Sequence, residues 1–140
     1  LVLDGAAEAY LLMDEIKKAK AEIILHPTMA RNEGDMLNMT REAATILIKA
    51  GIPVSIESGY EAYVPKTRIV LYEAALAAAY GLSFEEALQT ITIQPARLLG
   101  IDKRVGSIEV DKDADLVMYD GDPFEYTTHV KGVLIDGALQ

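Results

Sequence analysis

The sequence predicts an α/β fold in which strand and helix units build a parallel sheet and a short β-rich tail follows. Two observations lead to this prediction. Over residues 1–100, short apolar runs alternate with longer segments of helical periodicity. Beyond Gly100, the chain changes to short strand-like segments separated by polar turns. We therefore expect two parts, residues 1–100 and residues 101–140.

Residues 1–100 contain three successive strand and helix units. The predicted strands and helices alternate at residues 1–3, 6–20, 23–25, 41–50, 53–56 and 68–80. Thr40 is expected to cap the second helix, and Gly51 and Gly81 mark the ends of the second and third helices. Strands joined by helices form a parallel sheet with right-handed crossovers. Three such units cannot close a barrel, because a closed parallel barrel needs eight strands.

Two further short helices are expected before the tail. Ser83 and Glu86 have the S-x-x-E spacing of a capping box, which predicts a helix that runs to about residue 92. Pro95 suits the first turn of a second helix, where its missing N–H has no consequence.

The tail is predicted to be a small β unit. Residues 107–110 and 114–119 indicate a hairpin around a polar turn at residues 111–113. Residues 130–135 predict a final strand that ends at the tight-turn dipeptide Asp136-Gly137. The tail's histidine, His129, is expected to be structural. The acids Asp111, Asp113 and Asp115 are expected to form a solvated turn, because they lack the glycine and distant glutamate of a calcium loop.

Composition excludes several classes of function. The 140 residues are 51% hydrophobic and carry a formal net charge of −9, and no basic stripe is present, so no nucleic-acid partner is expected. The absence of cysteine excludes disulfides and thiolate metal sites. The longest charge-free stretch, residues 74–84, is too short to cross a bilayer, so no membrane association is expected and the protein is predicted to be cytoplasmic. The chain begins inside an apolar run, which predicts that upstream sequence is missing.

A polar or ionisable residue ends each of the three predicted strands, and these residues are Asp4, His26 and Glu57. Reactive groups gather at the carboxyl ends of parallel strands, so we expect these side chains to share one site. An imidazole and two carboxylates can bind zinc, manganese or iron and leave positions open for water. The ion would lower the pKa of that water and supply a nucleophile for amide hydrolysis. We expect Asp4 to be a metal ligand and His26 and Glu57 to be catalytic.

Each of these residues also has a structural interpretation. Asp4 could cap the helix that follows it, His26 could be a loop histidine before a proline, and Glu57 could simply leave the strand ahead of a permissive glycine.

The loops after the second and third strands offer groups that could bind a small-molecule substrate. Arg31, in the loop after His26, could grip a substrate carboxylate with two hydrogen bonds. Ser58 and Tyr60 are further candidates for substrate contacts.

Seven short segments together resemble one known family. They are Tyr72-Glu73-Ala74-Ala75, Tyr80-Gly81-Leu82-Ser83, Glu86-Ala87-Leu88, Gln94-Pro95-Ala96, Gly106-Ser107-Ile108-Glu109, Lys112-Asp113-Ala114-Asp115-Leu116-Val117 and Asp120-Gly121-Asp122-Pro123. The chain resembles the C-terminal portion of the amidohydrolase superfamily, in its imidazolonepropionase-like branch. The resemblance is clear over residues 72–137 and looser over residues 1–59.

The resemblance implies a fold and an activity. The fold would be the last βα units of a (β/α)8 (TIM) barrel, followed by part of a small composite β-sandwich whose other strands come from the absent N-terminal sequence. The activity would be hydrolysis of carbon–nitrogen bonds in cyclic amides, amino-acid amides or dipeptides. It would use one or two divalent metals, zinc foremost, bound mostly by residues outside this chain. The fragment alone is therefore expected to be inactive, and to associate with the missing N-terminal half or with copies of itself.

The sequence departs from the family pattern at the expected ligand positions. Asp4-Gly5 stands where the resemblance implies His-Gly, and Glu57 is the carboxylate nearest to the Asp expected around Ser58 or Gly59. These departures support an alternative, in which the protein is a non-catalytic relative that keeps the fold for binding a small molecule or for assembly. Asp111 also replaces a common Gly, a change that a turn tolerates.

Overall fold

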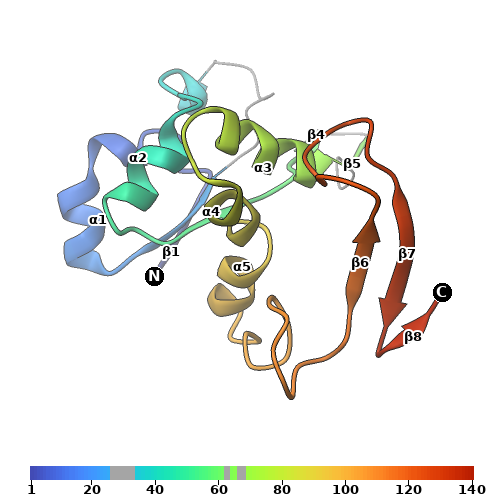
Figure 1. Cartoon of the computed structure of the whole chain (residues 1–140). Coiled ribbons are helices and arrows are strands. Elements are labelled where there is room, and N and C mark those ends of the chain that lie inside the picture. Colours follow the sequence, from blue (N-terminus) through green and yellow to red (C-terminus); the bar gives the residue numbers. More distant parts are fainter. Residues whose placement is uncertain (26–33, 62–63, 66–68) are drawn as a thin grey trace.

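The computed structural model describes residues 1–25, 34–61, 64–65 and 69–140. A parallel sheet in the order β1-β2-β3 consists of β1 (Val2–Asp4), β2 (Glu22–Leu25) and β3 (Val54–Ile56). Figure 1 shows α4 and α5 between this sheet with its helices and a second, antiparallel sheet, β6-β7-β8. The predicted α/β class is confirmed. The predicted division near residue 100 stays a prediction.

The described helices and the remaining strands are short. The helices are η1 (Ala9–Leu11), α1 (Met13–Ala19), η2 (Gly34–Met36), α2 (Ala43–Lys49), α3 (Val70–Ala79), α4 (Phe84–Gln89) and α5 (Ile93–Leu98). The remaining strands are β4 (Tyr60–Glu61), β5 (Val64–Pro65), β6 (Leu116–Tyr119), β7 (Val130–Ile135) and β8 (Ala138–Leu139).

One face of the parallel sheet packs against the helices. Leu3, Ile23 and Val54 lie side by side in the strand register, and all three contribute to the main hydrophobic core or pack against it. Ile23 and, on α2, Leu47 are fully buried. Because side chains alternate along a strand, the residues next to Leu3, Ile23 and Val54 in each strand point to the other face of the sheet. The helices therefore cover one face, and by the same alternation Asp4 and Glu57 belong to the other.

The predicted helix over residues 6–20 is wrong in its first half. The structure has a short 3-10 helix, η1, followed at Met13 by α1. Two side chains of this region bind elsewhere, because the Tyr10 hydroxyl donates to the Asn38 carbonyl over 2.9 Å and Glu8 accepts from the Asn38 amide. The spacing of apolar residues cannot reveal hydrogen bonds to residues so distant in the sequence.

The prediction that Thr40 caps α2 is wrong. The N-cap residue is Glu42, and its own side chain makes no capping hydrogen bond. The Thr40 hydroxyl instead donates to the Glu42 carboxylate and accepts from the Glu42 N–H over 3.4 Å. The threonine therefore binds the residue that begins the helix, two positions further along the chain.

The capping box of α4 is confirmed. The Ser83 hydroxyl accepts from the Glu86 N–H over 3.2 Å, and the Glu86 carboxylate accepts from the Ser83 N–H over 2.8 Å. The next helix, α5, holds Pro95 in its first turn as predicted. The pKa of Glu86 is lowered, mainly by the hydrogen bond that its carboxylate accepts from the Ser83 N–H. Glu86 is therefore ionised at neutral pH, and both hydrogen bonds of the box are present.

We expect Ser83→Ala to lower the free energy of unfolding by about 1 kcal/mol, because the Glu86 N–H loses its acceptor. Chemical denaturation measures this loss. Glu86→Gln is the matched control, because glutamine also completes a capping box.

The pKa of Glu86 is lower in the folded protein, so its carboxylate stabilises the fold at pH values above the unfolded-state pKa. This stabilisation is lost as the pH falls through the folded-state pKa. This acid dependence should vanish in Glu86→Gln, and its persistence would contradict the assignment.

The predicted hairpin of residues 107–110 with residues 114–119 is wrong. β6 pairs instead with β7, whereas Ile108 and Val110 are 85% and 90% exposed. Polar side chains hold the segment in a local loop: Lys112 Nζ donates to the Ser107 hydroxyl over 2.5 Å and lies 3.3 Å from a Glu109 carboxylate oxygen. Local side-chain bonds of this kind compete with pairing into a sheet.

The end of the tail forms as predicted. β7 and β8 pair through Ile135 and Ala138, so Asp136 and Gly137 alone make the turn. Their φ angles are 50° and 77°, which is the left-handed geometry of a tight hairpin turn. Asp111 also has a positive φ, 69°, so it occupies a position that favours glycine, in line with the replacement seen in the sequence.

Phe124 and Gly106 join the tail to the helices. The ring centroids of Phe84 on α4 and Phe124 in the tail are 5.0 Å apart, and Phe124 packs against the main core. Gly106 lies against the first turn of α5, so close that an added Cβ would be 2.8 Å from the Cβ of Ala96. In the part of the chain described here, no helix has both the length and the apolar composition needed to cross a membrane.

Candidate functional site

The carboxyl ends of β1 and β3 place two of the predicted site residues on one face of the sheet. Asp4 is in register with Ile24, and the Gly5 N–H continues the ladder to the Ile24 carbonyl over 3.1 Å. Glu57 directly follows β3, and its N–H donates to the Leu25 carbonyl over 3.1 Å. Side-chain alternation puts both carboxylates on the face opposite the helix core.

The central strand separates these two carboxylates. β1 and β3 both pair with β2, so their backbones are about 10 Å apart at the usual spacing of about 4.8 Å per strand. A group bound by both would therefore lie in front of the end of β2. The residue there is His26, which lies outside the described residues.

The other predicted site residues are placed only in part. Asp4 is exposed, and Glu57 and Ser58 are half-buried. Tyr60 belongs to β4 and pairs with Pro65 of β5. The predicted substrate ligand Arg31 lies outside the described residues, as His26 does.

One structural alternative for Asp4 is excluded. The N-cap residues of the two helices after β1 are Glu8 and Leu12, and neither helix has a side-chain cap. Capping therefore does not explain an aspartate at the end of β1.

A small cavity lies on the helix side of these strand ends. Its volume is about 30 Å³, and Leu25 and Ile56, the last residues of β2 and β3, line it together with Glu73 of α3. Glu73 is only 1% exposed. Buried carboxylates are rare in proteins unless they are bound by other groups. The burial of Glu73 could not be predicted from the sequence, because an acid within an Ala-rich helix resembles a surface acid.

One basic and one acidic side chain near the cavity, Arg41 and Glu42, have perturbed pKa values. A hydrogen bond of 2.8 Å from the Arg41 guanidinium to the Tyr80 hydroxyl is the main cause that raises the pKa of Arg41. The hydrogen bond from the Thr40 hydroxyl is the main cause that lowers the pKa of Glu42. Both side chains are therefore charged at neutral pH.

The described residues do not assemble a metal site by themselves. Across residues 1–25, 34–61, 64–65 and 69–140, no three His, Cys, Asp or Glu side chains gather closely enough to hold an ion. The donors present suit a hard or borderline divalent metal, because Asp4 and Glu57 offer carboxylate oxygens. These residues could supply part of a ligand set, and the rest would have to come from His26 or from outside this chain.

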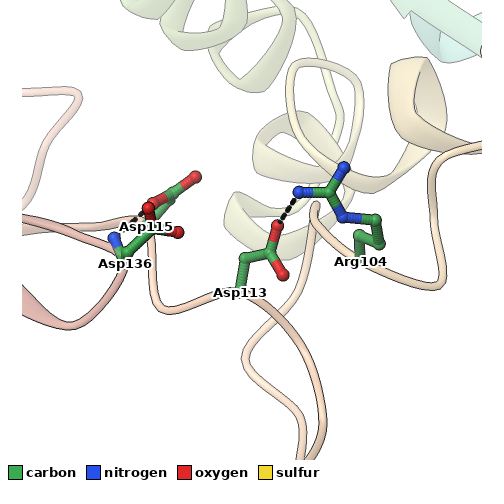
Figure 2. A network of polar contacts seen from close by, with 4 residues as sticks. All are labelled: Arg104, Asp113, Asp115 and Asp136. Atoms are coloured by element: carbon green, nitrogen blue, oxygen red, sulfur yellow. Dashed lines mark hydrogen bonds and ion pairs between the residues drawn. The ribbon is translucent and has the colours of Figure 1, made fainter.

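Two acidic residues of the tail, Asp113 and Asp115, have structural partners (Figure 2). Asp113 forms an ion pair with Arg104, and this bond is the main cause that raises the pKa of Arg104. Asp115 accepts a hydrogen bond of 2.9 Å from the Asp136 N–H and so supports the β7–β8 turn. The two carboxylates bind different parts of the tail and are not arranged around a common ligand.

His129 also has a structural partner. Asp120 accepts from the His129 N–H over 2.7 Å, which is the main cause that lowers the pKa of Asp120. The Nδ1 atom of His129 lies 3.6 Å from the same carboxylate, which also forms an ion pair with Lys131. These bonds join the start of β7 to the end of β6.

Comparison with known proteins gives concordant matches. A sequence model described as the amidohydrolase family matches residues 4–139. An imidazolonepropionase of Thermoplasma volcanium is 35% identical over 103 residues, which cover 69% of this chain and 25% of that protein. An amidohydrolase structure from Thermotoga maritima superimposes with a TM-score of 0.89 at 32% identity, covering 99% of this chain and 36% of that chain.

A more distant structure shows the fold alone. An adenosine deaminase from Xanthomonas campestris with bound zinc superimposes with a TM-score of 0.70 at 21% identity, and the match covers 99% of this chain and 36% of that one. The chain therefore spans about a quarter to about a third of the length of these relatives.

Proposed function

This chain belongs to the amidohydrolase family, and on that premise we propose that the complete protein is a metal-dependent hydrolase of carbon–nitrogen bonds. The proposed substrates are cyclic amides, amino-acid amides or dipeptides. The observation that best supports the proposal is the placement of Asp4 and Glu57 on one face, at the carboxyl end of a parallel sheet. Active sites of parallel α/β barrels lie at that end.

The proposal includes a complete barrel. The three parallel strands would be its last strands, and strands from outside this chain would cover the face that carries Asp4. Two observations support this: Val2 on that face is 43% exposed, and the chain covers 36% of the Thermotoga maritima amidohydrolase. The tail would correspondingly be one part of a β-sandwich. Association with the remaining sequence, and with further copies of the protein, belongs to the same proposal.

Each candidate residue has a proposed role. Asp4 is a metal ligand, and His26 and Glu57 carry protons between the attacking water and the leaving nitrogen. Ser58, Tyr60 and Arg31 orient the substrate from the loops above the sheet. A bound divalent ion, zinc foremost and otherwise manganese or iron, supplies Lewis acidity and makes water more acidic. Most of its ligands would lie outside this chain.

Metal removal tests the proposal in the complete protein. Purified in the presence of Zn²⁺ or Mn²⁺, the protein should hydrolyse at least one member of a panel of cyclic amides, amino-acid amides and dipeptides. Treatment with a chelator should lower the rate by about 100-fold or more, because Lewis-acid stabilisation contributes several kcal/mol, and the metal should restore it. A protein that binds neither ion and hydrolyses nothing in the panel would refute the proposal.

A non-catalytic relative is the second candidate. It is favoured by the aspartate at position 4, where the family resemblance implies histidine, and by the glutamate at position 57. Such a protein would bind a small molecule or assemble through the same fold without turnover. Elemental analysis separates the two candidates, because metal bound stoichiometrically through Asp4 in the complete protein, and lost in Asp4→Ala, would contradict the second.

A further inference from the structure

The end of β3 is held from both of its edges. The Glu57 N–H donates to the Leu25 carbonyl on β2 over 3.1 Å. One residue earlier, the Ile56 N–H points to the other edge and donates to the Thr90 carbonyl over 3.0 Å. Two consecutive amides are thus fixed from opposite sides, which determines the direction in which the Glu57 side chain leaves the strand.

Thr90 is itself fixed in place. It is the C-cap residue of α4 and is fully buried. Its N–H donates to the Ala87 carbonyl over 3.2 Å, and its hydroxyl donates to the same carbonyl over 2.6 Å. The last carbonyls of a helix receive no hydrogen bond from an N–H of the same helix, so the Thr90 carbonyl is available to the strand.

We infer that Thr90 is a positioning residue for the carboxylate of Glu57, an inference that rests on the proposed function. The hydroxyl bond to Ala87 sets the direction of the Thr90 carbonyl, that carbonyl holds the Ile56 N–H, and Ile56 determines where Glu57 stands. At this point of the β3 edge, the connection between α4 and α5 supplies the acceptor for the strand. Thr90 acts on the reaction only through Glu57.

The variant Thr90→Val tests this in the complete protein, because valine keeps the shape and removes the hydroxyl. Amide exchange at Ile56 should accelerate by about fivefold or more, as expected for the loss of one hydrogen bond. The value of kcat on the panel substrate should fall by about 10-fold to 100-fold, since a displacement near 1 Å can cost about 100-fold, and KM should change little. Thr90→Ser, which restores the hydroxyl, should recover both.

Thr92→Val is the matched control. The Thr92 hydroxyl donates to the Leu88 carbonyl over 2.8 Å, which is the same kind of bond from a threonine two residues further along the chain. The Thr92 carbonyl, however, accepts from the Ala96 N–H within α5 and does not bind the strand. Thr92→Val should therefore leave Ile56 exchange and kcat close to those of the parent protein.

Either of two results overturns the inference: unchanged exchange at Ile56 in Thr90→Val, or an equal loss of kcat in Thr90→Val and Thr92→Val. If Thr90→Val does not fold, Thr90→Ala, which removes the hydroxyl with a smaller side chain, is read in the same way. A parent protein without hydrolytic activity refutes the proposed function alone, because exchange at Ile56 still decides whether Thr90 holds the strand.

Discussion

Replacing Glu57 with glutamine is expected to lower kcat of the complete protein by about 100-fold or more, because glutamine cannot take up and release a proton at neutral pH. Glutamine has nearly the same size, so the fold and the β3 backbone should persist. Steady-state kinetics on the panel substrate measure the change. A lower kcat with an unchanged KM would show that the carboxylate acts in the transition state and not in substrate binding.

Glu22→Gln provides the control for this result. Glu22 begins β2 on the same face of the sheet, in register with Val2, but at the amino ends of the strands. It is half-buried, as Glu57 is. Its substitution should leave kcat unchanged, because active sites of this architecture lie at the other end. Equal losses in the two variants would show that the face, and not the strand end, matters, and would contradict the assignment of Glu57.

Gly106→Ala is expected to destabilise the protein by about 2 to 5 kcal/mol. The φ angle of Gly106 is 94°, which strains any residue with a Cβ. The added Cβ would also lie 2.8 Å from the Cβ of Ala96 and 3.0 Å from the Cα of Ile93. The backbone of α5 cannot rotate away as a flexible side chain could, so the helix and the tail would have to separate. Urea denaturation should show a lower midpoint.

Gly100→Ala separates the two causes of that loss. Gly100 also has a positive φ, 69°, but an added Cβ would meet no atom within 4 Å among the described residues. This variant should cost only about 1 kcal/mol, the price of the backbone conformation. If Gly106→Ala costs no more than Gly100→Ala, the close packing of the tail on α5 is not a source of stability.

The sequence predicted the fold best where local chemistry decides the structure. The β-branched runs that contain Ile23 and Val54 became strands of the parallel sheet, and the capping box at Ser83 formed as expected. The tight turn at Asp136-Gly137 followed from its left-handed preference. Predictions failed where a competing bond decided, as at Ser107, whose hydroxyl binds Lys112 and holds a β-prone segment in a loop.

The candidate site was predictable only at the level of strand ends. Asp4 and Glu57 are recognisable because each follows a short apolar run, and parallel strands bring such positions to one edge. Thr90 and Glu73 could not be found in this way. Their positions depend on which helix turn meets the β3 edge and on which helix faces the strand ends, and these are properties of the packed chain.

The ring contact between Phe84 and Phe124 has a consequence for how the protein unfolds. Because Phe124 also packs against the main core, the tail cannot detach without exposing apolar surface of α4 and of that core to water. Local opening of the tail therefore carries a cost shared with the α/β part, and cooperative units in proteins are defined by such shared costs. The tail and the sheet should accordingly lose amide protection together, as one foldon, although they form separate sheets.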